Sequence, residues 1–251
     1  MIPSNFHTHT TRCQHATGTE REYIEAALSV GMKRLGFADH CPVPFDDPTF
    51  TSTIRMSLAE AVDYVDTIRA LAEEYRSDID IFVGFEMEYM PKYFDQQIEF
   101  FDSLGIDYLI MGEHFLDDEN GGHYTGTGFT DPAFLRSYVD TVIEGMSTGR
   151  FKYLAHPDLI NFNGDEEIYL KEMGRLCQAM KDMNIPLEFN GIGLAGKRHY
   201  PCRRFWKIAS ETGNTGIVGL DAHSPDILKN QQLYDACVGY LQEFNVPQVF
   251  L

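Results

Sequence analysis

The sequence lacks the features that would place it in a membrane or in an oxidising compartment. It has no uninterrupted apolar run of membrane-spanning length, and its first six residues lack a basic stretch followed by an apolar core. We therefore expect neither a transmembrane helix nor a signal peptide. The five cysteines form no CxxC pair, and a chain of this length can bury a core without disulfides. The sequence thus predicts reduced thiols and a cytoplasmic protein.

Basic residues are also scarce. The 251 residues include 20 Lys and Arg against 38 Asp and Glu, which gives a formal net charge of -18. This charge repels phosphodiester backbones and anionic lipid headgroups, so we expect no nucleic-acid or membrane partner. A few basic side chains gathered in one place could still bind a small phosphate. The oligomeric state does not follow from the sequence.

Short apolar runs alternate with stretches of helical periodicity along the whole chain. Helices are predicted over residues 57–75 and 131–146, and from Ser224-Pro225 through Leu241. Strands are predicted to end near Phe6, Ala38, Phe85, Met111, Ala155, Phe189 and Leu220. Seven strand–helix units in succession predict an α/β fold with parallel strands. The sequence has no GxGxxG turn after its first strand, and no linker stands out. The even spacing of seven units favours a single domain over 1–251 that forms a distorted (β/α)7 TIM-like barrel rather than an open doubly wound sheet.

Imidazole and carboxylate side chains follow nearly every predicted strand. Because active sites of α/β folds form at the carboxyl ends of the strands, these side chains are expected to lie at one rim. His7 and His9 are two residues apart, which places both imidazoles on the same side of an extended strand, and Asp221 and His223 share this spacing. A single histidine at a strand end is more often structural than a ligand. The recurrence of histidine at equivalent strand ends favours one shared metal site, and the histidines concerned are His7, His9, His40, His114, His156 and His223.

The types of candidate ligand restrict the ion. Imidazoles and carboxylates without paired thiolates suit Zn, Mn, Fe or Ni better than a calcium cage or a zinc knuckle. The imidazoles and carboxylates at the strand ends, about nine candidate side chains, are too many for one ion, so two or three divalent metal ions are predicted, bridged by Asp or Glu. Such a cluster can hold a hydroxide at neutral pH for displacement at phosphorus. Cys13 and Cys41 lie beside candidate ligands, and we interpret them as small buried thiols.

Taken in order, these segments resemble the polymerase-and-histidinol-phosphatase (PHP) superfamily of metal-dependent phosphoesterases. The residues that carry the resemblance are His7-Thr8-His9, His15, Ala38-Asp39-His40, Gly84-Phe85-Glu86, His114, His156-Pro157 and Asp221-Ala222-His223. The stretches 12–16, 36–42, 112–116 and 190–201 are similar to the monofunctional histidinol-phosphate phosphatases. The resemblance implies the distorted (β/α)7 barrel and three metal positions. These would be held by His7, His9, Glu86 and Asp221; by the shared Glu86 with His114 and His156; and by His15, His40 and His223.

The resemblance also implies an activity, the hydrolysis of L-histidinol phosphate to L-histidinol and phosphate in histidine biosynthesis, by a hydroxide that bridges the metals. Asp39 and Asp221 are the candidates for protonating the leaving alkoxide, and the general acid stays unassigned between them. Lys197 and Arg198 are predicted to bind the phosphate, although they could equally form a solvated loop. Ser224 could bind phosphate or cap the following helix.

Several acidic residues have two interpretations each. Asp46-Asp47 and Asp117-Asp118-Glu119 could face the ammonium group of the substrate, but a solubilising surface is the favoured interpretation. Glu88 is expected to support a ligand. Glu113 departs from the family pattern, which has a small residue there, and an extra carboxylate could alter the choice of metal or the reach of the substrate.

Three alternatives remain at this point. The first is a PHP phosphatase or phosphodiesterase acting on another small phosphoester such as a nucleotide. The second is a non-catalytic metal-binding barrel, although the degraded ligand set typical of that class is not seen. The third is an amidohydrolase, for which the sequence offers no strand end with a lysine to be carbamylated.

Overall fold

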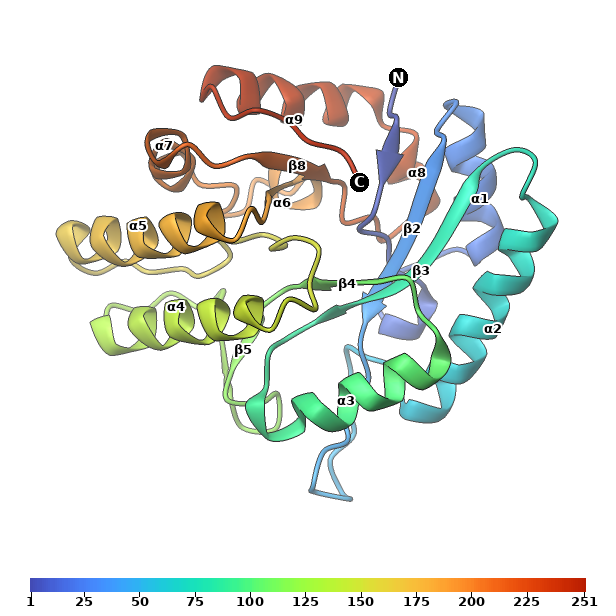
Figure 1. Cartoon of the computed structure of the whole chain (residues 1–251), viewed down its shortest axis with the longest axis horizontal. Coiled ribbons are helices and arrows are strands. Elements are labelled where there is room, and N and C mark those ends of the chain that lie inside the picture. Colours follow the sequence, from blue (N-terminus) through green and yellow to red (C-terminus); the bar gives the residue numbers. More distant parts are fainter.

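Parallel strands form the centre of the computed structural model, which describes all residues 1–251 (Figure 1). One sheet contains four parallel strands in the order β1 (Ser4–Asn5), β2 (Arg34–His40), β3 (Asp80–Met87) and β4 (Tyr108–Met111). A second pairs β7 (Leu187–Asn190) with β8 (Gly216–Gly219), again in parallel. The only antiparallel pair is a short hairpin of β5 (Phe115–Leu116) and β6 (His123–Tyr124). The predicted α/β fold with parallel strands is therefore confirmed.

The sheet is curled, and single-residue bridges continue its pairing beyond the named strands. Leu154 forms parallel bridges with Met111 and with Leu187, and Thr8 forms one with Ala222. The predicted strand that ends at Ala155 is thus reduced to a bridge, so a continuous seven-stranded ladder is not observed. His156 has a left-handed φ of 27° and Pro157 has no N–H to donate, which ends the extended conformation at this point.

Helices surround the strands in Figure 1. The predicted helix over 57–75 is confirmed as α2, which begins with a capping box between Ser57 and Glu60. The helix predicted from 131 is confirmed as α4, because Asp131 caps it and Pro132 is its first residue. The bounds are α1 (Glu20–Ser29), α2 (Leu58–Glu74), α3 (Pro91–Leu104), α4 (Pro132–Ser147), α5 (Glu166–Asp182), α6 (Gly191–Ala195), α7 (Arg203–Thr212), α8 (Pro225–Leu228) and α9 (Gln231–Glu243), with a 3-10 turn at Thr11–Cys13.

The prediction of one helix from Ser224 to Leu241 is wrong. The chain forms the single turn α8 and then starts again as α9. Asn230 separates the two, because its side chain accepts a hydrogen bond from the backbone N–H of Leu233 and caps α9. A short polar side chain that bonds to its own backbone competes with helix continuation in this way. No helix of the chain combines the length and the apolar character that crossing a bilayer requires.

Two apolar clusters support the strand ends. The larger contains 54 buried residues and joins helices to strands, for example through the ring of Phe85, which lies 4.7 Å from that of Phe101. The smaller contains Phe6, Ala38, Tyr108, Ile110, Tyr153, Ala155 and Ile217. Tyr108 packs so closely that a Cβ added at Gly36 would lie 2.4 Å from its hydroxyl oxygen. Phe6 and Ala155 directly precede His7 and His156, so this small cluster forms the floor beneath the polar strand ends.

Candidate metal centre

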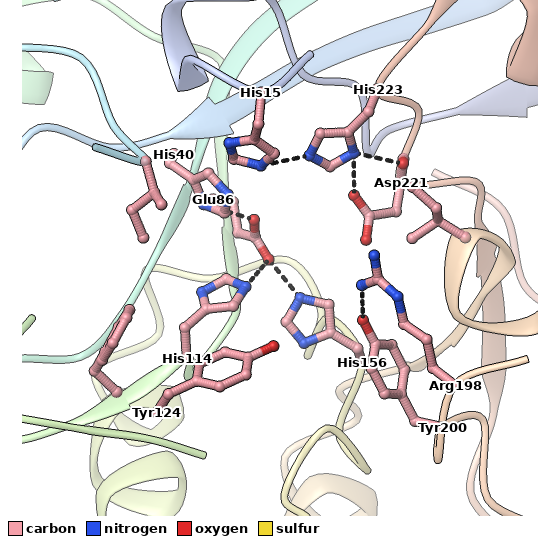
Figure 2. Close-up of a pocket in the computed structure, with 13 residues that line it drawn as sticks. His15, His40, Glu86, His114, Tyr124, His156, Arg198, Tyr200, Asp221 and His223 are labelled. Atoms are coloured by element: carbon pink, nitrogen blue, oxygen red, sulfur yellow. Dashed lines mark hydrogen bonds and ion pairs between the residues drawn. The ribbon is translucent and has the colours of Figure 1, made fainter. Parts of the chain in front are cut away.

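The carboxyl ends of the strands surround one cavity of about 450 Å³. Its lining, shown in Figure 2, consists of His15, His40, Ile54, Glu86, His114, Phe115, Tyr124, His156, Ile192, Arg198, Tyr200, Asp221 and His223. His7 and His9 are fully buried beside it, each within 3.5 Å of Glu86. All nine side chains that were predicted as ligands thus come together, although they span the chain from residue 7 to residue 223.

The first predicted set of ligands has the spacing of donors to a single ion. The Nε2 atoms of His7 and His9 are 3.1 Å apart. Oδ1 of Asp221 lies 3.2 Å from Nε2 of His9 and 3.6 Å from that of His7. Oε2 of Glu86 lies 3.4 and 3.5 Å from the same two nitrogens. Two donors at the usual 2.0–2.1 Å from a tetrahedral zinc ion are about 3.3 Å apart, so these distances suit one ion.

Glu86 links this set to the other two. Its Oε1 lies 2.7 Å from Nε2 of His156 and 3.5 Å from Nε2 of His114, the second predicted set. The third set, His15, His40 and His223, has its ligand atoms within 4.8 Å of one another. His40 also approaches Glu86, with its Nδ1 at 3.1 Å from Oε2. The carboxylate of Glu86 is therefore the common neighbour of the cluster in Figure 2.

The chemistry of these donors fits divalent cations. His40 Nδ1, Glu86 Oε2 and Asp221 Oδ1 are buried, and although they lie close to other polar atoms, none of them has a partner in hydrogen-bonding geometry. This is costly unless another ligand satisfies them. Nε2 of His15 and Nε2 of His223 face each other at 3.0 Å, as do those of His7 and His9, and such pairs of lone pairs need a cation or a proton between them. Burial alone would raise the pKa of Glu86, but the imidazoles of His114 and His7 lower it well below its usual value. The carboxylate is thus charged and ready to bind metal.

Three further buried carboxylates stand behind the imidazoles. Glu188 accepts a hydrogen bond from Nδ1 of His7 at 2.7 Å, and Glu88 accepts one from Nδ1 of His114 at 3.0 Å. Asp39 lies 3.4 Å from Nδ1 of His9. Such contacts fix the tautomer and leave Nε2 free for a metal. The expectation that Glu88 supports a ligand agrees with this contact.

Asp39, one of the two candidates for the unassigned general acid, lies behind the cluster and not in the cavity lining. Its carboxylate accepts hydrogen bonds from the backbone N–H groups of Thr10 and His40 at 2.9 and 2.8 Å. Burial alone would raise the pKa of Asp39, but the bonds from His9 and Thr10 lower it. The hydrogen bonds that Asp39 accepts suit a carboxylate that orients its neighbours, and its lowered pKa disfavours the protonated form.

Glu113 also differs from its expectation as an extra carboxylate at the site. Its side chain is buried outside the cavity lining, and Oε2 accepts a hydrogen bond from the backbone N–H of Tyr89 at 3.0 Å. Burial, and then the charge of Glu88, raise its pKa well above the usual value. Burial thus favours the protonated form of Glu113, and its position outside the lining adds no ligand to the cluster.

Only one of the three predicted phosphate contacts reaches the cavity. Arg198 lines it, and its Nη1 donates a hydrogen bond to the hydroxyl of Tyr200 at 2.7 Å. Lys197 is exposed outside the lining, on a residue with a left-handed φ of 50°. Ser224 lies in a separate groove beside Gly18 and makes no side-chain bond to cap α8. The acidic runs also lie outside the lining, and Glu119 instead binds Arg55 at 2.7 Å.

Some functional candidates were missed from the sequence. The apolar and aromatic part of the cavity wall is made of Ile54, Phe115, Tyr124, Ile192 and Tyr200, which lie in loops, a hairpin and a short helix without a distinctive pattern. Glu188 belongs to the polar residues that the sequence places near the end of the sixth predicted strand, but it was not among the predicted ligands; in the structure it lies within β7.

The chain is similar to proteins of known family and structure. The model of the PHP domain family matches residues 5–191. A protein of Deinococcus radiodurans named "Probable histidinol-phosphatase" is 29% identical, over 87% of this chain and 85% of the relative. Histidinol-phosphatase of Bacillus subtilis is 26% identical, over 75% of this chain and 80% of the relative. A solved structure of histidinol phosphate phosphatase from Lactococcus lactis, complexed with Zn, L-histidinol and phosphate, has the same fold, with a TM-score of 0.71 at 17% identity over 98% of this chain and 95% of that one.

Proposed function

The chain belongs to the PHP domain family, and we propose that it is a metal-dependent phosphatase that hydrolyses L-histidinol phosphate to L-histidinol and phosphate. The observation that carries this proposal is the convergence of seven imidazoles and two carboxylates on one cavity. The names of the two relatives support the substrate. The size of the cavity suits a small phosphate monoester, because sites for small molecules are typically about 300–1,000 Å³.

Two or three divalent ions (Zn, Mn or Fe) are proposed for the cluster. His7, His9, Glu86 and Asp221 would hold one ion, Glu86 with His114 and His156 a second, and His15, His40 and His223 a third. Bound there, such ions would acidify water and neutralise charge on the phosphoryl oxygens. Burial would raise the pKa of Asp221, but His7 and His223 lower it well below its usual value. We therefore assign Asp221 to metal binding and not to protonation of the alkoxide.

Arg198 would bind the phosphate. Its guanidinium lines the cavity and donates one hydrogen bond to Tyr200, which leaves further N–H donors for two oxygens of a phosphate group. Tyr200 would fix the orientation of this fork. Arg198 is the only Lys or Arg in the cavity lining, so it is the candidate with the largest expected effect on substrate binding.

The apolar wall would bind the organic part of the substrate. Phe115, Tyr124 and Tyr200 offer aromatic surfaces beside Ile54 and Ile192, and a flat ring such as imidazole packs well against them. The same wall could accept the base of a nucleotide, which keeps a nucleotide phosphoesterase as the second candidate.

The finer architecture is part of the proposal. We infer one domain over 1–251 with a distorted seven-unit barrel. Hydrogen bonds from Ala155 to Met111 at 2.7 Å and from Glu188 to Leu154 at 2.9 Å support a fifth strand between β4 and β7. The Thr8–Ala222 bridge supports closure between the first and last strands.

The decisive experiment measures kcat/KM for histidinol phosphate, mononucleotides and an aryl phosphate, with metal content determined on the same sample. Histidinol phosphate is expected to be the best substrate. Absence of hydrolysis by metal-loaded protein would refute the enzymatic proposal, and a preference for mononucleotides would favour the second candidate. Arg198→Ala should lower kcat/KM at least tenfold, about 1.4 kcal/mol, whereas unchanged kinetics would remove Arg198 from the site.

A further inference from the structure

Arg55 is the only Lys or Arg among the buried polar residues of the chain. It lies in the loop between β2 and α2, and its side chain is 1% exposed. Its Nη1 and Nη2 donate to the two carboxylate oxygens of Glu88 at 2.9 and 3.0 Å. Nη1 also donates to the carbonyl of Cys41 at 3.1 Å, and Nε donates to Glu119 at 2.7 Å. The guanidinium of Arg55 has no role in the phosphatase chemistry proposed above.

The first connection of Arg55 leads to a candidate metal ligand. Oε1 of Glu88, which Arg55 binds, also accepts the hydrogen bond from Nδ1 of His114 at 3.0 Å. The bidentate guanidinium fixes the plane of the carboxylate, and the carboxylate in turn fixes the ring of His114. Nε2 of that ring faces Glu86 at 3.5 Å. Arg55 is therefore connected to the imidazole of His114, which would bind metal, through a single intervening side chain, that of Glu88.

The second connection leads to the cavity wall. Glu119 lies in the turn of the β5–β6 hairpin, which carries Phe115 and Tyr124 of the cavity lining. Glu119 also accepts hydrogen bonds from the hydroxyl of Ser52 at 2.8 and 3.0 Å. Since Ile54 of the lining precedes Arg55 in the chain, the guanidinium joins the two segments that cover one side of the cavity.

We propose that Arg55 is a positioning residue that sets the orientation of His114 through Glu88 and, through Glu119, holds the wall that contacts the organic part of the substrate. This inference rests on the proposed function only for what the site binds. Arginine is required because a lysine ammonium is a point charge without a planar fork, so it cannot bind both oxygens of Glu88 and also reach Glu119.

The test compares Arg55→Lys with Arg69→Lys. Arg69 forms an exposed bidentate pair with Asp107 at 2.9 Å for both bonds, so it undergoes the same chemical change away from the cavity. The affinity for Zn is measured by competition with a chromophoric chelator, and KM and kcat are measured at saturating metal. Circular dichroism and thermal unfolding check folding. Because loss of a partner behind a metal-binding histidine typically costs about 10–100-fold in affinity, R55K should weaken Zn binding at least tenfold, and R69K should not.

Two further variants separate the connections. Glu88→Gln keeps an oxygen toward His114 but turns a donor toward Nη1 of Arg55, so it should also weaken Zn binding, and it replaces R55K if that variant does not fold. Glu119→Ala removes only the connection to the wall, so it should raise KM by about threefold or more and leave Zn affinity within about twofold.

The outcomes distinguish this inference from the proposed function. Folded R55K and E88Q that bind Zn as tightly as the wild-type protein would overturn the role of Arg55, whatever the substrate. The role of Arg55 would also be overturned if R69K lost as much Zn affinity as R55K. A wild-type protein that hydrolyses no phosphomonoester would instead refute the phosphatase assignment, while the Zn affinities would still test Arg55.

Discussion

Glu188→Gln should impair metal binding by changing the tautomer of His7. Oε1 of Glu188 accepts a hydrogen bond from Nδ1 of His7 at 2.7 Å, and Oε2 accepts from the backbone N–H of His156 at 3.1 Å and from the side-chain amide of Asn190 at 2.9 Å. Glutamine has the same shape but only one acceptor oxygen. If the NH2 group of the glutamine faces His156 and Asn190, it meets two N–H donors and both of these hydrogen bonds are lost. If it faces His7, it meets only one donor. The second orientation is therefore favoured.

In that orientation Nδ1 of His7 must accept a hydrogen bond, so the ring proton moves to Nε2. Nε2 is the atom that lies 3.1 Å from Nε2 of His9 and 3.4 Å from Glu86, and once protonated it cannot bind metal. A lost partner of this kind costs about 10–100-fold in metal affinity, equivalent to about 1.4–2.7 kcal/mol. Chelator competition measures the affinity, and ¹⁵N NMR of the metal-free protein reports the tautomer.

Glu172→Gln is the matched control. Glu172 is also a buried glutamate, 3% exposed, but it binds Arg175 on α5 instead of a candidate ligand. E172Q should keep the Zn affinity of the wild-type protein. The reasoning would be refuted if E188Q bound Zn as tightly as E172Q, or if His7 kept its proton on Nδ1 in E188Q.

Three other results are expected. Glu113→Gln should leave Zn affinity within about twofold, because Glu113 lies outside the cavity lining. Since burial and Glu88 raise the folded-state pKa of Glu113, the stability of the wild-type protein should fall as the pH rises above about 4.3, and unfolding free energies from pH 5 to 8 should show a smaller decline in E113Q. Asp39→Asn should reduce the unfolding free energy at pH 7 by about 1–3 kcal/mol. Because bonds from His9 and Thr10 outweigh burial and lower the folded-state pKa of Asp39, the difference in unfolding free energy between the variant and the wild-type protein should shrink as the pH falls below about 3.9. A difference that stays constant with pH would contradict this. Removal of metal by EDTA should lower Tm by about 5–10 °C, since ions at 100 times their Kd contribute about 2.7 kcal/mol, and an unchanged Tm would argue against a bound ion.

The elements of the fold were largely predictable because their signals are local. Ser57 and Asp131 mark helix starts by their own hydrogen bonds, and the apolar strands are short runs in the sequence. The break at Asn230 was missed because an apolar periodicity continues across it, whereas the cap depends on a single side chain. The weak strand around Leu154 was overestimated because its pairing depends on neighbours from β4 and β7.

In the site, as in the fold, some features were predictable and others were not. The positions of the ligands are set by the strand ends, whereas the cavity wall is set by the loops. Parallel strands bring their ends to one rim whatever the loops do, so the positions of His7, Glu86 and Asp221 followed from their places in the sequence. The groups behind the ligands depend on how the strands are arranged. Glu188 lies on β7, which pairs with Leu154 near His156, and its side chain also reaches His7 on a strand that is not its direct neighbour. The wall depends on loop conformation, which Arg55 fixes through its contacts with Glu88 and Glu119. These residues are 33 and 64 positions from Arg55 in the sequence. Local patterns therefore identify where metal chemistry can occur, while the orientation of the ligands and the choice of substrate depend on buried pairs that only the folded chain brings together.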